Sequence, residues 1–195
     1  MSAARALPSL TQELAAITGA EFVNEDAGVL RVFAVEGVAP AVTVSPGSAE
    51  EIAAILRLAS ARGLVVIPCG GFTHQQQGGL PERGGILLKT VRLRALRHYD
   101  PGDLTFGADA GITLEETGRA LAEHGQFLPL EVVRPQAATL GGALAVAAQG
   151  PLSHAYGGVR DFCIGVTFVT GDGKIAQGGG RVVKNVAGYD LMKLL

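Results

Sequence analysis

The sequence predicts an α+β protein in which a parallel βαβ unit is followed by a mainly antiparallel region. Two apolar runs at 41–44 and 64–67 flank a helical pattern, an order that is typical of parallel strands joined by a crossover helix. Further along, an alternating run at 163–170 is followed by Gly171-Asp172-Gly173, which favours a hairpin. The chain has 195 residues and is 48% hydrophobic, so it can bury a sizeable core.

Residues 1–37 predict a helix and strand segment that packs on the rest of the domain. Leu14 and Ile17 indicate a short helix that ends at Gly19. Short strands are expected around Phe22 and over Leu30–Val35.

The βαβ unit is predicted from a strand at Ala41–Val44, a helix, and a strand at Leu64–Ile67. Ser48 and Glu51 have the spacing of a capping box, and Gly63 is placed to end the helix. One face of this helix is expected to carry apolar residues at helical spacing, namely Ile52, Ile55, Leu56 and Ala59.

The second region is expected to begin at Ile86–Leu88 and to continue with a strand at Leu104–Ala108. Thr113 starts a second capping box, for a helix that ends near Gly125. The hairpin at Gly171-Asp172-Gly173 comes next, with its second strand at Lys174–Gln177. The second region is therefore predicted to be largely antiparallel.

Composition and charge exclude several classes of function. A net charge of −2 without a run of Lys and Arg argues against a nucleic-acid partner. Cys69 and Cys163 form no CxxC or Cys/His pattern, so we expect two buried thiols and neither a metal site nor a disulfide. No stretch approaches about 18 uninterrupted apolar residues, which predicts a cytoplasmic protein without a transmembrane segment. The apolar helical pattern at 189–195 ends without a cap, so the chain is expected to be a piece of a longer protein.

A glycine-rich loop follows the second strand of the βαβ unit. The run 68–79 exposes successive backbone N–H groups, which can form a nest for phosphate oxygens. It lacks the Gly-Lys-Ser/Thr ending of a P-loop and the G-x-G-x-x-G spacing of a Rossmann turn. Since 72–80 contains no Lys or Arg, Thr73 or a protonated His74 would assist the amides. The alternative is a turn that binds no ligand.

A second segment, 135–150, combines glycines with a helix-capping residue. Thr139 can cap a short helix, and Gly141 and Gly142 would let a flat ligand approach its first turn. Tight packing of small residues is the alternative. A large phosphate-bearing ligand could span this segment and the loop at 68–79.

A third segment, 154–162, precedes the predicted buried strand. His154 and Tyr156 could approach a ring system, and Arg160 with Asp161 could form an ion pair. The alternative is a purely structural loop.

The three segments together resemble a known cofactor-binding domain. Pro68-Cys69-Gly70-Gly71-Phe72-Thr73, Ala138-Thr139-Leu140-Gly141-Gly142 and Tyr156-Gly157-Gly158-Val159-Arg160-Asp161-Phe162 resemble the FAD-binding domain of the vanillyl-alcohol oxidase and p-cresol methylhydroxylase superfamily. The run Gly179–Leu191 is similar to the FAD-binding subunit of bacterial glycolate oxidase. The resemblance covers residues 38–195.

The resemblance implies two α/β subdomains of the p-cresol methylhydroxylase type over 38–195, the first reaching to about residue 90 and the second spanning 91–195. FAD would lie between them without a covalent bond, facing a C-terminal cap domain that this chain lacks. No metal and no catalytic residue of this chain are implied. The positions that match cofactor contacts are Gly70, Gly71, Phe72, Thr73, His74, Thr139, Gly141, Gly142, Tyr156, Gly157, Gly158, Val159 and Val169.

The phosphate loop departs from the family pattern at two positions. Cys69 stands where many relatives have Arg, and Phe72 stands where they usually have a third Gly. His74 lies one position late for the histidine that attaches flavin covalently in the superfamily. The loop is therefore bulkier and less basic than the pattern.

For function, the resemblance implies an FAD-dependent oxidoreductase subunit of a glycolate oxidase-like complex that oxidises a small 2-hydroxy acid. The implied partners are a second flavoprotein subunit and an iron–sulfur subunit, through which the chain would be peripheral to the inner membrane. Without a cap domain this chain alone would be inactive. The departures at Cys69 and Phe72 leave an alternative, a non-catalytic structural or electron-relay subunit with a degenerate flavin site. A third reading, based on the glycine loops alone, is a nucleotide-binding module unrelated to flavin.

Overall fold

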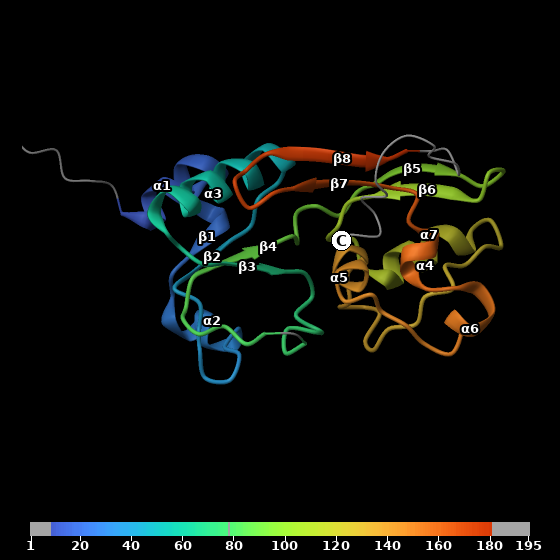
Figure 1. The fold of residues 1–195 in the computed structure, drawn as a ribbon, viewed down its shortest axis with the longest axis horizontal. Coiled ribbons are helices and arrows are strands. Elements are labelled where there is room, and N and C mark those ends of the chain that lie inside the picture. Colours follow the sequence, from blue (N-terminus) through green and yellow to red (C-terminus); the bar gives the residue numbers. More distant parts are fainter. Residues whose placement is uncertain (1–8, 78, 181–195) are drawn as a thin grey trace, which may run out of the picture.

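The structure, a computed structural model, describes residues 9–77 and 79–180 (Figure 1). One half of the molecule is built around a four-stranded sheet, and the other holds a two-stranded sheet with several short helices below it (Figure 1). A second two-stranded sheet runs along the top of both halves (Figure 1). The predicted helix at 189–195 and the part of the Gly179–Leu191 motif beyond residue 180 lie outside the described residues.

The N-terminal segment begins with the predicted helix. Helix α1 (Leu10–Thr18) starts in a complete capping box between Ser9 and Gln12 and ends at Gly19, as expected. A 3₁₀ turn (Ala20–Phe22) then leads into strand β1 (Val23–Asn24).

The strand predicted over Leu30–Val35 is wrong. Helix α2 (Ala27–Val32) occupies this place, because the Asp26 side chain accepts hydrogen bonds from the N–H groups of Gly28 and Val29 and so caps a helix.

The four-stranded sheet has the order β1-β2-β4-β3, with β2 (Val42–Val44), β3 (Val66–Cys69) and β4 (Ile86–Lys89) mutually parallel. The parallel βαβ unit is thus confirmed, with helix α3 (Ala49–Arg62) as its crossover. Strand β4 lies between β2 and β3, so the expectation that Ile86–Leu88 opens the second region is wrong. Its three apolar residues are at most 4% exposed, as is typical of a central parallel strand.

Helix α3 begins and ends where its sequence predicts. Ser48 Oγ accepts a hydrogen bond from the Glu51 N–H, but the Glu51 carboxylate accepts from Gly47 instead of Ser48, so half of the capping box forms. Gly63 ends the helix in the left-handed conformation, with φ 61°. The core that joins α1 and α3 to the sheet consists of Leu14, Val42, Val44, Ile55, Ala59, Ile86 and Leu88.

The second half contains the antiparallel pair β5 (Leu96–Asp100) and β6 (Thr105–Ala108), of which β5 was not predicted. Helix α4 (Leu114–Ala122) starts in a complete capping box between Thr113 and Glu116. The remaining helices are short: α5 (Leu140–Ala145), α6 (Ser153–Tyr156) and α7 (Val159–Phe162).

The predicted hairpin is confirmed as β7 (Gly165–Val169) and β8 (Ile175–Gly179), which are antiparallel. Its turn reaches the first half, where the Arg57 guanidinium of α3 donates to the Gly173 carbonyl over 2.7 Å. A Cβ at Gly173 would lie 2.5 Å from the Ala53 carbonyl oxygen, and φ there is +77°, so glycine is required for this contact. The hairpin therefore ties the two halves together.

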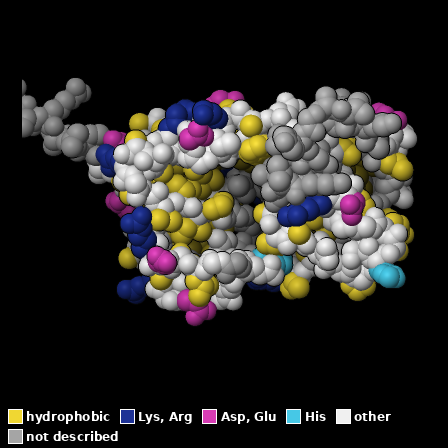
Figure 2. All heavy atoms as spheres, viewed as in Figure 1, with side chains coloured by type: hydrophobic (Ala, Val, Ile, Leu, Met, Phe, Trp, Pro, Cys, Tyr) yellow, Lys and Arg dark blue, Asp and Glu magenta, His cyan; other side chains and the backbone are white. Residues whose placement is uncertain are grey.

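Apolar side chains gather on the visible face of the first half, and charged side chains lie mostly around its edge (Figure 2). Within residues 9–77 and 79–180, no helix is long and apolar enough to cross a membrane. The subdomain boundary near residue 90 falls between β4 and β5 and stays a prediction.

Candidate cofactor-binding site

The glycine-rich loop leaves the end of β3 and is anchored there by hydrogen bonds. The Cys69 carbonyl accepts from the Thr90 N–H over 2.9 Å, which joins the end of β3 to the residue after β4. The Gln75 side chain donates back to the Pro68 carbonyl over 3.2 Å. The loop therefore folds over the carboxyl end of the sheet.

Several amides of this loop have no protein partner. Within the part of the chain that the structure describes, the N–H groups of Gly70, Gly71, Thr73 and His74 donate to no acceptor. The Thr73 hydroxyl and the His74 ring nitrogen Nδ1 lie 2.9 Å apart and form a hydrogen bond. Since buried or half-buried amides are normally satisfied, these donors are available for a ligand with oxygen acceptors.

Cys69 brings no charge to the loop. Its side chain is 2% exposed, and burial raises the pKa of the thiol, while Lys89 and the Phe72 N–H oppose that shift. The prediction of a buried thiol is confirmed for Cys69, whereas Cys163 is half-exposed, so that part is wrong. Lys89 itself lies over the Phe33 ring, 4.8 Å from its centroid.

Two of the predicted segments pack directly on each other. A Cβ added at Gly71 would lie 1.6 Å from the Ala137 carbonyl oxygen, and one added at Gly70 would lie 2.1 Å from Thr139 Oγ1. These glycines therefore allow the phosphate loop to approach the segment before α5. The structure thus brings Gly70–His74 and Thr139–Gly142 together.

The start of α5 differs from the loop, because its amides are already used. Thr139 caps the helix as predicted. The N–H groups of its first residues donate within the protein: Leu140 to Ile112 O, Gly141 to Ala110 O, and Gly142 to Thr139 Oγ1. The expectation that this segment presents free amides to an anion is not met, so its contribution to a site is its shape.

A cavity of about 370 Å³ opens beside the phosphate loop. Its wall combines residues 72–77 with Ala34, Val35 and Arg134. Sequence reasoning missed these last three residues. Ala34 and Val35 belong to the N-terminal segment, and Arg134 directly precedes the 135–150 run without a motif of its own.

Arg134 gives this cavity a positive charge. Among the described residues, no hydrogen bond or ion pair engages its guanidinium. Of the loop residues with unpaired amides, Thr73 and His74 line the same cavity as Arg134. Amides and a cation are the donors that a diphosphate requires, so these residues fit a dinucleotide.

Phe72 lies in the left-handed region of backbone conformation, with φ 56°. Its ring packs edge-on against Phe33, with centroids 5.4 Å apart. Because left-handed backbone strains any residue with a Cβ, the position suits glycine even though the ring has a partner.

We therefore expect Phe72→Gly to be more stable than Phe72→Ala by about 1 kcal/mol, the reverse of the usual order. Both variants remove the ring, so the difference isolates backbone strain. The free energies of unfolding come from urea titration. Phe33, with φ −99°, is the matched control, and there the alanine variant should be the more stable. Equal stability of the two Phe72 variants would contradict the strain.

The third predicted segment lies apart from this cavity. Tyr156 is 52% exposed and packs edge-on against Phe127, with centroids 5.8 Å apart. The Gly158 N–H donates to Asp161 over 2.8 Å, and the described ion pairs do not join Asp161 to Arg160, so that expected pair is wrong. Val159 is buried at the start of α7, which contacts α5.

Val169 ends β7 opposite Ile175 and also lies outside the wall of the cavity. The part of the chain that the structure describes holds no group of three or more His, Cys, Asp or Glu placed to bind a metal ion.

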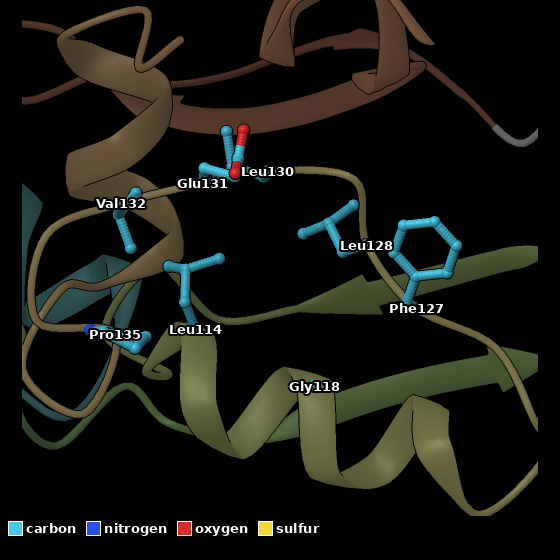
Figure 3. A pocket seen from close by; sticks show the side chains of 8 residues that line it. All are labelled: Leu114, Gly118, Phe127, Leu128, Leu130, Glu131, Val132 and Pro135. Atoms are coloured by element: carbon cyan, nitrogen blue, oxygen red, sulfur yellow. The ribbon is translucent and has the colours of Figure 1, made fainter. Parts of the chain in front are cut away.

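A second cavity, of about 340 Å³, lies between α4 and the segment 127–135 (Figure 3). Its wall is mostly apolar, with Leu114, Leu128 and Leu130 among its residues. Its one charged side chain, Glu131, accepts a hydrogen bond from the Leu152 N–H over 2.8 Å. An apolar cavity with a carboxylate does not suit phosphate, so the cavity beside the loop is the better candidate for the cofactor site.

Comparisons with known proteins show the family of this chain. D-2-hydroxyglutarate dehydrogenase of Xanthomonas citri pv. viticola is 32% identical over 80% of this chain and 33% of its own length. Glycolate oxidase subunit GlcD of Bacillus subtilis is 30% identical over 80% of this chain and 33% of its own. Glycolate oxidase subunit GlcE of Escherichia coli is 43% identical over 52% of this chain and 29% of its own. The chain thus spans about a third of the length of these relatives.

Solved structures confirm the fold. Alkyldihydroxyacetonephosphate synthase matches 94% of this chain and 36% of its own, with a TM-score of 0.79 at 22% identity. Substrate-bound p-cresol methylhydroxylase matches 87% of this chain and 34% of its own, with a TM-score of 0.70 at 18% identity. The predicted α+β architecture of the p-cresol methylhydroxylase type is therefore confirmed. The FAD binding domain family matches residues 40–179. This chain belongs to that family, and its cofactor is FAD.

Proposed function

We propose that this chain is the FAD-binding part of an oxidoreductase that takes two electrons from a small 2-hydroxy acid. The relatives that support this proposal are a dehydrogenase named for 2-hydroxyglutarate and two subunits named for glycolate oxidase. Bound FAD supplies a hydride acceptor for such an oxidation. The residues of this chain hold and orient the cofactor, and glycolate is the narrower proposal for the substrate.

We place the FAD diphosphate against Gly70–His74. The observation that carries this proposal is the set of unpaired amides in this loop beside a cavity of about 370 Å³. Thr139, Gly141 and Gly142 stay predicted cofactor contacts. Their segment packs on Gly70 and Gly71 but does not line this cavity.

Tyr156–Val159 and Val169 stay predicted contacts of the flavin and adenine ends of the cofactor. Non-covalent binding is also a proposal. It rests on His74, whose ring nitrogen Nδ1 is hydrogen-bonded to the Thr73 hydroxyl. His74 also lies one position after the histidine that attaches flavin covalently in the superfamily.

The proposed partners are a second flavoprotein subunit and an iron–sulfur subunit. Two relatives carry the word subunit in their names, which supports an assembly of several chains. The cytoplasmic location stays a prediction.

A titration of the purified chain with FAD tests the proposal. We expect flavin absorbance that survives desalting, a rise in melting temperature with FAD, and weaker effects of ATP or NAD. Absence of retained flavin together with an unchanged melting temperature contradicts FAD binding. Preference for ATP or NAD favours the nucleotide-binding module instead.

A second candidate is a non-catalytic structural or electron-relay subunit with a weakened flavin site. The buried neutral thiol of Cys69 and the left-handed backbone of Phe72 favour it. If weakening at these positions is the cause, the double variant Cys69→Arg, Phe72→Gly binds FAD more tightly than the parent. Unchanged affinity argues against this candidate.

A further inference from the structure

We propose that Arg134 supplies the positive charge for the anion held by the loop at 70–77, and so sets the affinity of this chain for a diphosphate. The inference rests on the proposed function, because the diphosphate of FAD is the anion in question. Arg134 lies outside the glycine motifs and would be the charged half of the site.

The loop itself lacks a cation. A diphosphate carries formal negative charge that backbone dipoles alone stabilise less well than dipoles with a cation. From residue 72 to residue 80 the sequence contains no Lys or Arg. Lys89, at the end of β4, already lies over the Phe33 ring, 4.8 Å from its centroid. Of the Lys and Arg residues that the structure describes, Arg134 is the one that lines the cavity beside this loop.

Arg134 lines the same cavity as Phe72–Gln77. Two other arginines of the second half are engaged in ion pairs: Arg97 pairs with Asp109 over 2.8 Å, and Arg94 pairs with Glu116. Within the described residues, the Arg134 guanidinium has no such partner. Its planar fork of donors suits two phosphate oxygens at once.

A tight backbone turn fixes the position of the Arg134 Cα atom beside the loop. Arg134 has a φ of 56°, and its carbonyl accepts from the N–H groups of Ala137 and Ala138 over 2.9 and 2.8 Å, which closes the turn. Ala137 packs on Gly71 so closely that no Cβ fits between them. The turn that carries Arg134 is therefore braced against the loop that carries the free amides. A strained residue kept at a cavity is typical of a functional position.

The test compares Arg134→Gln and Arg134→Lys with the parent, using FAD and inorganic pyrophosphate as separate probes in calorimetric titrations. Arg119→Gln is the matched control, since it removes the same charge from an exposed pair on α4. We expect Arg134→Gln to lower the affinity for both FAD and pyrophosphate about tenfold or more, and to make binding less dependent on salt concentration. Arg134→Lys should retain an intermediate affinity, and Arg119→Gln should bind as the parent does.

The outcomes separate this inference from the proposed function. If Arg134→Gln binds both probes as tightly as the parent, the inference falls and FAD binding stands. If pyrophosphate binds in an Arg134-dependent way but FAD does not bind, the anion site stands and the flavin assignment falls. If the parent binds neither FAD nor pyrophosphate, both the inference about Arg134 and the proposed function are overturned. Unliganded melting temperatures should match among the variants, because the Arg134 side chain has no partner among the described residues.

Discussion

Gly71→Ala is expected to destabilise the protein by about 3 kcal/mol or more and to abolish tight FAD binding. The added methyl would lie 1.6 Å from the Ala137 carbonyl oxygen and 2.5 Å from its carbon. Both are backbone atoms in a hydrogen-bonded turn, so they cannot swing aside as a flexible side chain would. The loop and the turn would have to separate, which moves the free amides away from Arg134.

Gly79→Ala is the matched control from the same loop. No atom lies within 4 Å of a Cβ at Gly79, and its backbone is not in the left-handed region. The free energy of unfolding of this variant should lie within about 0.5 kcal/mol of that of the parent, or be slightly higher. Urea unfolding measures the stability of both variants, and titration measures their FAD binding. Similar stability of the two variants would show that the close approach at Gly71 is absent.

Ile86→Ala is expected to cost about 2–5 kcal/mol of unfolding free energy. Ile86 is 0% exposed in β4, where it pairs with Val42 on one side and Val66 on the other. Truncating it leaves a cavity among side chains from three strands. Because β4 is the central strand, the loss should appear in the global unfolding transition measured by circular dichroism in urea.

The control for Ile86 is Ile175→Ala in β8. Ile175 is 45% exposed, so the same chemical truncation removes little buried surface and should cost under about 1 kcal/mol. If the two variants lose equal stability, β4 does not occupy the centre of the core.

Elements with local signals could be predicted from the sequence. The helices that start after Ser48, Thr113 and Thr139 each begin where a side-chain oxygen accepts a hydrogen bond from a nearby amide. The hairpin at 171–173 follows from its glycines in the same way. Such signals act over a few residues and need no knowledge of the fold.

Elements decided by distant contacts could not be predicted. An apolar run such as Ile86–Leu88 marks a buried strand, but its place between β2 and β3 depends on pairing across the chain. The segment Leu30–Val35 has strand-like composition, and the cap at Asp26 outweighs it.

The candidate site divides in the same way. The amides of Gly70–His74 are exposed by local glycine chemistry, which the sequence shows. The amide of Gly141 is taken by the carbonyl of Ala110, a residue from a distant part of the chain, and no local pattern reveals that acceptor. Arg134 enters the cavity through the packing of its turn on Gly71, and no spacing rule could reveal that contact.

The contact between Arg57 and Gly173 also bears on how quickly the chain folds. The two residues are 116 positions apart, so the loop that they close is long and its closure costs chain entropy before any contact is gained. Helix α3 reaches its final environment only after the β7–β8 hairpin has been made. During synthesis on the ribosome, the surface of α3 that contacts this hairpin therefore stays uncovered until β7 and β8 have emerged.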